Sequence, residues 1–253
     1  MDEVLITRKD RITIITINRP DVRNAVNYKT SKMLENAMLE FNSDSIQHIA
    51  IITGTGGNFS AGADLSDAEK MGGEVLNKNG PMGFSRMDFQ KPVIAAVEGY
   101  CVAGGLEMAL AADIRVAGKN AKLGFLERRF GVPLIDGGTQ RLPRIIGMGR
   151  ALDLILTGKI ISADEAHRIG LINYLAEGGK ALEKAVEIAM LIDSFPWTTV
   201  VNDRLALIQG ISGTLDDGLR VEAEFGKKTI ESGVVKEGAE RFLSGSGRHG
   251  NRK

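Results

Sequence analysis

The sequence has little of the side-chain chemistry on which covalent and metal-dependent enzymes rely. It contains one cysteine, Cys101, and three histidines, His48, His167 and His249. A single cysteine cannot form a disulfide within the chain, and its small apolar neighbours indicate a buried, reduced thiol. No G-x-S-x-G motif is present and the histidines lie outside the glycine-containing turns, which argues against a serine hydrolase. No cluster of His, Cys and carboxylates has metal-ligand spacing, so we expect no metal site.

Net charge and long apolar segments are also absent. The 32 basic and 32 acidic residues cancel, so no overall field attracts the protein to nucleic acid or to an anionic membrane. Acidic residues interrupt the apolar runs near Val93–Val97 and Val102–Ala112, which fall short of the roughly 18 residues of a spanning helix. Residues 1–10 are charged and have no apolar core, unlike a secretory signal. We therefore expect a cytoplasmic protein with neither nucleic acid nor membrane as a partner.

The apolar residues follow an alternating strand and helix pattern through the first part of the chain. Residues 4–17 alternate around a charged turn and predict two short strands. Tyr28–Phe41 has apolar residues at a helical period, and Ile49–Thr53 is an apolar strand of the kind that is buried on both faces. This pattern predicts an α/β fold. It continues as strand, helix, strand and helix over Val93–Val97, Gly104–Ala112, Asp113–Ala117 and Gly149–Leu156.

Beyond residue 162 the pattern changes to successive helices, predicted at 163–169, 181–191, 197–209 and 215–228. We therefore expect an α/β core over residues 1–160 and a helical region over residues 161–245. Helices with one apolar face and little sheet to cover often pack on another subunit, so we expect a homo-oligomer. Residues 246–253 are predicted to be disordered. Met71–Gly83, rich in glycine, predicts a flexible surface loop and a candidate lid.

Two glycine-containing turns follow buried strands. Phe59–Leu65 comes after Ile49–Thr53, and Gly99–Glu107 comes after Val93–Val97. Small residues let a ligand carbonyl approach the backbone, and amides at a helix start carry partial positive charge. Two such turns side by side would donate two amide hydrogen bonds to one oxygen, as an oxyanion hole requires. Tight backbone packing is the alternative explanation for the same glycines.

Two glutamates are candidate acid–base groups. Glu107 lies in a segment of Ala, Gly, Leu and Met, and glutamate is seldom buried without a reason. Burial would raise its pKa toward the range of a general acid or base. Glu127 precedes Arg128 and Arg129, so a salt bridge is its structural alternative. Taken alone, each glutamate fits a structural role as well as a catalytic one.

Several motifs together resemble the crotonase superfamily of enoyl-CoA hydratases and isomerases. They occur in order from residue 5 to residue 245, and as a set they are specific for the superfamily rather than for one reaction. The motifs are Asn18-Arg19-Pro20 with Asn24-Ala25, Ser60-Ala61-Gly62-Ala63-Asp64-Leu65, residues 91–97 followed by Ala103-Gly104-Gly105-Leu106-Glu107, Ala111-Ala112-Asp113-Ile114-Arg115, Gly137-Gly138-Thr139-Gln140-Arg141-Leu142, and Leu156-Thr157-Gly158 with residues 162–166.

The resemblance implies a crotonase-like spiral of ββα units with a C-terminal helical region that builds trimers, usually paired into hexamers. It implies an acyl-CoA thioester as substrate, with coenzyme A entering only as part of that substrate and no separate cofactor. The amides of Ala63 and Gly104 would form the oxyanion hole. Glu107 and Glu127 would match the two hydratase glutamates, which hold a water that attacks C3 while C2 is protonated, in our assignment by Glu127.

The same resemblance implies a coenzyme A site on the loop of Arg23 and Ala25 and along the turn that follows the third predicted strand. The residues implied there are Ala61, Ala63, Asp64, Leu65 and Gly104. The lysine that relatives often have after this turn is replaced by Ser66, so one expected contact to a phosphate of coenzyme A is missing. Arg23 would supply a positive charge in its place.

Other departures bear on the reaction. Leu126 stands where hydratases usually have proline, and Leu134 and Ile135 stand where they have small residues, which would narrow an acyl pocket. Asp136 adds a third acid, at a position that resembles the base of dienoyl-CoA isomerases. The paired glutamates favour a hydratase, whereas Asp136 and the bulky residues favour an isomerase with Glu127 or Asp136 as base.

Two further alternatives come from other classes. A non-catalytic acyl-CoA-binding relative would be favoured by loss of the glutamates, and both are present. A nucleotide-binding protein would use Gly54–Gly57 after its strand, but no helix pattern follows those glycines, as the dinucleotide fingerprint requires.

Overall fold

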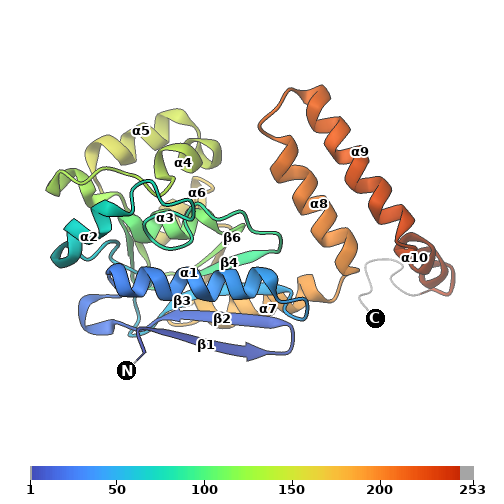
Figure 1. Cartoon of the computed structure of the whole chain (residues 1–253), viewed down its shortest axis with the longest axis horizontal. Helices are drawn as coiled ribbons and strands as arrows, with labels where there is room; N and C mark the ends of the chain where they lie inside the picture. Colours follow the sequence, from blue (N-terminus) through green and yellow to red (C-terminus); the bar gives the residue numbers. More distant parts are fainter. Residues whose placement is uncertain (1, 246–253) are drawn as a thin grey trace. The chain divides into compact units, whose positions relative to one another are not determined.

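The strands form two hydrogen-bonded sheets within residues 2–245, the part of the chain that the computed structural model describes (Figure 1). The larger sheet has the order β1 (Val4–Lys9), β2 (Ile12–Ile17), β3 (Ile49–Gly54), β4 (Val93–Val97), β6 (Ile114–Gly118) and β9 (Tyr174–Ala176). The smaller has the order β5 (Tyr100–Val102), β7 (Lys122–Gly124) and β8 (Ile161–Ser162). From β4 to β7, successive strands alternate between the two sheets.

The larger sheet is parallel except at its first pair. β1 runs antiparallel to β2, and the remaining neighbours pair in parallel. Ile49–Thr53 and all of β4 are buried, because their side chains are apolar on both faces of the sheet. β1 is an edge strand in which Val4 alone is buried. The strands predicted at residues 4–17, 49–53 and 93–97 are therefore confirmed.

One helix packs on the larger sheet, and a second packs against β5 of the smaller sheet. α1 (Tyr28–Ser43) begins at Asn27, whose side chain accepts a hydrogen bond from the Thr30 amide. It packs on β1 and β2 and buries one apolar face, formed by Leu34, Ala37, Met38 and Phe41. α3 (Gly104–Ala111) has few large side chains and is buried on almost every side. The other α-helices before residue 194 are α2 (Ala68–Gly73), α4 (Gly138–Ile146), α5 (Met148–Thr157), α6 (Ala163–Arg168) and α7 (Ala181–Asp193).

The chain divides into two compact units, Met1–Met190 and Leu191–Lys253, which differs from the predicted boundary at residue 160. β8 pairs with β7, and β9 extends the larger sheet beside β6, so residues 161–176 belong to the sheets of the first unit. The first turn of α7 is also held there, because the Ala181 amide donates to Glu98 Oε1 at 2.8 Å. Strands of two and three residues have no periodicity from which a sequence could reveal them.

The second unit contains α8 (Trp197–Gly210), α9 (Leu215–Glu231) and α10 (Val234–Leu243). α9 begins with a capping box in which Thr214 and Asp217 exchange hydrogen bonds. A β-carbon at Gly210 would lie 3.1 Å from Gly218 Cα, so α8 and α9 come close together where both helices have glycine. Leu205, Ala206 and Phe225 form the small core between them. The tail predicted to be disordered, residues 246–253, lies outside the described residues.

Sequence patterns missed three helices, of which α2 lies partly in the segment predicted as a loop. α4 starts at two glycines and contains Pro143, which lacks an amide hydrogen and usually ends a helix. α10 follows α9 after a short glycine turn and has no buried residue, so it gives no strong apolar pattern. Among the helices of residues 2–245, none has the length and hydrophobicity needed to cross a membrane.

Candidate active site

The two glycine-containing turns lie side by side, as the sequence predicts. Ser60 and Cys101 form an isolated bridge, with the Ser60 amide donating to Tyr100 O at 2.9 Å and the Val102 amide donating to Ser60 O at 3.1 Å. A β-carbon at Gly62 would lie 2.9 Å from the Gly104 nitrogen. The absence of side chains at such positions therefore permits backbone-to-backbone contact.

Two backbone amides are left without acceptors at this contact. The residues on either side of Ala63 are bonded to Val26, since the Val26 amide donates to Gly62 O and the Asp64 amide donates to Val26 O. Gly104 is the first residue of α3, where amides have no intrahelical partner. Neither the Ala63 nor the Gly104 amide hydrogen-bonds to any group of residues 2–245.

Ala103, the residue before Gly104, has φ of 55°. This conformation is rare for a residue with a β-carbon and costs on the order of 1–3 kcal/mol. Its amide donates to Gly124 O at 2.9 Å, and its carbonyl accepts from Leu106 at 2.9 Å, so both sides of the residue are fixed. The strained backbone is thus held in place immediately before the Gly104 amide.

Both amide-bearing residues line a cavity of about 460 Å³. Most of its other lining residues are apolar, including Met71, Val75 and Met82. The ionisable side chains in its lining are those of Arg23, Asp64, Tyr100, Glu107, Glu127 and Asp136. The structure therefore brings both glutamates and the aspartate of the sequence analysis to the cavity that contains the two amides.

Glu107 lies in the first turn of α3 and is 2% exposed. Its Oε1 accepts hydrogen bonds from the Asp136 amide at 2.9 Å and from the Gly138 amide at 2.7 Å. Burial, reinforced by the nearby carboxyl of Asp136, raises the pKa of Glu107 to about 8. Both protonation states are therefore accessible near neutral pH.

Glu127 lies in a 3-10 helix, η3 (Leu126–Phe130), and is 5% exposed. Neither of its buried carboxyl oxygens has a hydrogen-bond partner among the described residues. Burial raises the pKa of Glu127 to about 7. Arg129 instead donates to Gly158 O at 2.9 Å, so the structure does not favour the salt-bridge explanation. Leaving a buried carboxyl without a hydrogen-bond partner destabilises the fold, so a carboxyl that faces a cavity in this way points to a function there.

Asp136 is also buried, but its carboxylate, unlike that of Glu127, accepts hydrogen bonds. Oδ1 accepts from the Met82 amide at 3.0 Å and from the Ser85 hydroxyl. Burial raises the pKa of Asp136 despite these two donors. The segment predicted as a flexible surface loop, Met71–Gly83, therefore contributes fixed, buried residues: Met71 is 5% exposed and Met82 is 1% exposed.

The residues implied in coenzyme A binding mostly lie at the cavity. Arg23, Ala61, Asp64 and Leu65 line it, and the Arg23 guanidinium lies 4.6 Å from the centre of the Tyr100 ring. Ala25 does not line the cavity, and its carbonyl instead accepts a hydrogen bond from Arg19. Ser66 is engaged locally, since its amide and hydroxyl both donate to Asp64 Oδ1.

Comparison with known proteins shows to which family the whole chain is similar. The family described as enoyl-CoA hydratase/isomerase matches residues 7–246. The short-chain-enoyl-CoA hydratase of Clostridium acetobutylicum is 39% identical over 229 residues, 88% of each chain. The crotonyl-CoA hydratase of Syntrophomonas wolfei is 34% identical, over 96% of this chain and 95% of that one.

The chain belongs to the enoyl-CoA hydratase/isomerase family. Solved structures agree: enoyl-CoA hydratases from Mycobacterium marinum and Mycobacterium tuberculosis each superpose with a TM-score of 0.91. They are 38% and 39% identical to it, and each comparison covers 96% of both chains. The expected crotonase-like α/β fold with a helical C-terminal region is confirmed.

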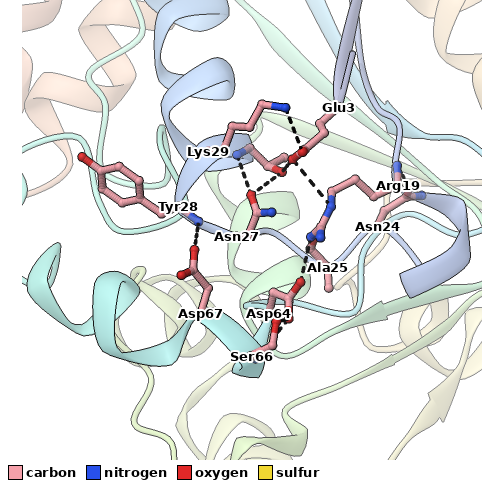
Figure 2. Close-up of polar contacts among 12 residues, drawn as sticks. Glu3, Arg19, Asn24, Ala25, Asn27, Tyr28, Lys29, Asp64, Ser66 and Asp67 are labelled. Atoms are coloured by element: carbon pink, nitrogen blue, oxygen red, sulfur yellow. Dashed lines mark hydrogen bonds and ion pairs between the residues drawn. The ribbon is translucent and has the colours of Figure 1, made fainter. Parts of the chain in front are cut away.

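Arg19, which the sequence analysis noted only as part of a motif, contacts the loops implied in coenzyme A binding. Figure 2 shows Arg19 between Glu3 and Asp64, with its guanidinium also directed at the carbonyl of Ala25. The Arg19–Asp64 contact is 2.9 Å, and the arginine side chain is 18% exposed. Arg19 thus joins Glu3, the residue before β1, to both loops implied in coenzyme A binding.

Cys101 is fully buried between the two turns, and its thiol lies 3.7 Å from Gly105 O. Burial raises the pKa of the Cys101 thiol far above its usual range, so it carries no thiolate at neutral pH. Within residues 2–245, no group of three or more His, Cys, Asp and Glu residues is placed to hold a metal ion.

The two raised glutamate pKa values predict how stability depends on pH. A buried carboxyl with a raised pKa binds more protons in the folded than in the unfolded state, so it stabilises the fold at low pH. That contribution is lost as pH rises from about 4.5 through about 8. Replacing Glu107 and Glu127 together with glutamine should remove this part of the pH dependence, on the order of a few kcal/mol.

The measurement is the urea midpoint by circular dichroism near pH 5 and near pH 8, the ends of that window. Glu222→Gln, at an exposed position of α9, is the control and should keep the wild-type difference. An identical difference in the double variant would show that the two carboxyls are not buried as described.

Proposed function

We propose that this protein is an enoyl-CoA hydratase, which adds water across the 2,3 double bond of an acyl-CoA thioester. The observation that carries the proposal is one cavity with two acceptor-free backbone amides and two buried carboxyls whose pKa values are raised. The names of the relatives from Clostridium acetobutylicum and Syntrophomonas wolfei support it, since both are hydratases of short or crotonyl thioesters.

In the proposed reaction, the thioester oxygen accepts hydrogen bonds from the Ala63 and Gly104 amides. These donors stabilise the negative charge that the oxygen gains when water attacks C3 and the π electrons move toward C2. The positive end of the α3 dipole adds to this stabilisation. The enolate then takes a proton at C2. The net reaction adds one water molecule, and the substrate is neither oxidised nor reduced. Such a reaction requires no separate cofactor.

The carboxyls divide the proton transfers. Glu107 Oε1 is held by two amides, which fix the carboxyl and leave Oε2 to accept a proton from the attacking water. Glu127 has no hydrogen-bond partner on either oxygen, and we assign to it the proton that reaches C2. Because both pKa values are raised toward neutrality, each group can exchange its proton between turnovers.

Coenzyme A is proposed to lie along Arg23, Ala61, Asp64 and Leu65, which open onto the same cavity. Arg23 is the cation of that lining and would meet a phosphate, in the absence of a lysine at Ser66. Ala25 acts only indirectly in this proposal, through its carbonyl contact with Arg19.

A double-bond isomerase with Glu127 or Asp136 as base is the alternative. The presence of Asp136 in the cavity lining favours it. Asp136 Oδ1 already accepts two hydrogen bonds, which leaves Oδ2 as the oxygen that would take a substrate proton in such an isomerase.

Gly104 offers a test of the proposed oxyanion hole. Gly104→Pro removes the amide hydrogen and should lower kcat for hydration of crotonyl-CoA on the order of 10²–10³-fold. Gly104→Ala is the comparison variant, because it keeps the amide; its β-carbon would lie 3.1 Å from the Met82 sulfur, so this side chain must shift slightly, and a much smaller loss of kcat than in the proline variant is expected. Circular dichroism should first show that both variants fold. A folded proline variant with wild-type kcat would exclude this amide from the mechanism.

Variants of the two glutamates test whether the enzyme is a hydratase or an isomerase. Glu107→Gln and Glu127→Gln should each lower kcat for crotonyl-CoA hydration by roughly 10²-fold or more, because each removes a titratable proton at nearly constant size. The assay is the loss of conjugated enoyl absorbance, run beside double-bond migration in a 3-enoyl-CoA. Wild-type hydration in both variants would refute the paired mechanism, and fast migration with slow hydration in the wild type would favour the isomerase.

The helices of the second unit support a homo-oligomer, as a trimer or a pair of trimers. Leu207, Ile211, Leu215, Leu219 and Ile230 are each more than half exposed on this single chain, more apolar surface than an isolated subunit should present to water. Light scattering at micromolar concentration should therefore give the mass of three or six chains. A monomer at that concentration would contradict the proposal.

A further inference from the structure

Asp136 makes contacts in two directions at once. Its carboxylate accepts hydrogen bonds from the Met82 amide at 3.0 Å and from the Ser85 hydroxyl. Its own amide donates to Glu107 Oε1 at 2.9 Å. A single residue, 3% exposed, therefore joins the segment 79–86 to the carboxyl that we place next to the substrate.

The segment on one side of this link is fixed closely. Gly80 has φ of 89°, and a β-carbon there would lie 2.1 Å from Ser85 Oγ. The Ser31 hydroxyl of α1 donates to Pro81 O at 2.6 Å. Met82 lines the cavity, and its sulfur would lie 3.1 Å from a β-carbon at Gly104. The position of this segment thus determines the cavity wall next to the Gly104 amide.

The backbone on the other side of the link is fixed by two arginines. Arg141 donates to Asp136 O at 3.0 Å, and Arg86 donates to Ile135 O. The Gly138 amide, at the start of α4, donates to the same Glu107 oxygen at 2.7 Å. Asp136 therefore has a fixed backbone from which its side chain can hold Met82 and Ser85.

We propose that Asp136 is a positioning residue: its carboxylate holds Met82 beside the Gly104 amide while its own amide holds Glu107 at the cavity. The inference rests on the proposed hydratase function for its catalytic consequence, and it gives Asp136 a different role from the isomerase base. Misplacing a reacting group by about 1 Å can cost roughly 10²-fold in rate, so such a clamp has a measurable effect.

Three variants distinguish a positioning role of Asp136 from a role as catalytic base. Asp136→Asn keeps an oxygen that accepts from Met82 and Ser85, so it should retain most of kcat for crotonyl-CoA hydration. Asp136→Ala removes the acceptor and should lower kcat roughly 10- to 100-fold with little change in KM. Ser85→Ala removes one donor and should lower kcat roughly fivefold, the equivalent of one hydrogen bond of about 1 kcal/mol. Ser43→Ala, an exposed serine at the end of α1, is the matched control.

The pH–rate profile gives a readout that a purely structural role would not change. The carboxyl of Asp136 raises the pKa of Glu107 by charge repulsion. Asp136→Asn removes that charge, so the limb of the profile that reports Glu107 should move to lower pH. An unchanged pH–rate profile would contradict the proposed link between Asp136 and Glu107.

Other outcomes are equally decisive. An Asp136→Asn variant as slow as Asp136→Ala, with Ser85→Ala at the wild-type rate, would overturn the clamp in favour of a base. If Asp136→Ala does not fold, the asparagine and Ser85→Ala variants still make this distinction. If the wild type does not hydrate crotonyl-CoA, the proposed function fails, and hydrogen exchange tests the clamp alone. The Met82 amide should then exchange faster in Ser85→Ala than in Ser43→Ala, and equal rates would overturn the clamp.

Discussion

The site depends on a close contact between the two glycine-containing turns, at positions where glycine has no side chain to hold the backbones apart. A β-carbon at Gly105 would lie 2.4 Å from Ser60 O, and one at Gly62 would lie 2.8 Å from the Ala103 β-carbon. Any other residue at either place would force the turns apart. Because the turns touch, the amides of Ala63 and Gly104 come to one cavity wall, and the first turn of α3 brings Glu107 to the same wall.

The sheet explains how two segments far apart in sequence reach this contact. β3 and β4 are parallel neighbours, so the turns that follow them leave from the same edge of the sheet. Burial on both faces holds these strands, and the turns are anchored in the same core by Phe59, Cys101 and Leu106. The candidate site is thereby positioned by buried strands, and the irregular segments complete the cavity.

The sequence predicted those parts of the site that follow from local patterns. Apolar strands and glycine-containing turns are contiguous signals, and Glu107 stood out because an acid interrupts a run of small apolar residues. Met82 could not be found this way, because it lies beside Gly104 only in the folded chain, where its amide donates a hydrogen bond to Asp136, 54 positions away. The conformation of Ala103 was also hidden, since a positive φ is expected of glycine and asparagine rather than alanine.

The single cysteine has a practical consequence. Its side chain is fully buried in the core, and its backbone pairs with Ser60 across the two-turn contact, so a thiol reagent can reach it only when the surrounding structure opens. The rate at which Cys101 is modified in the native protein therefore measures how often the structure around this contact opens. No label has to be introduced for this purpose, because no other thiol in the chain competes for the reagent.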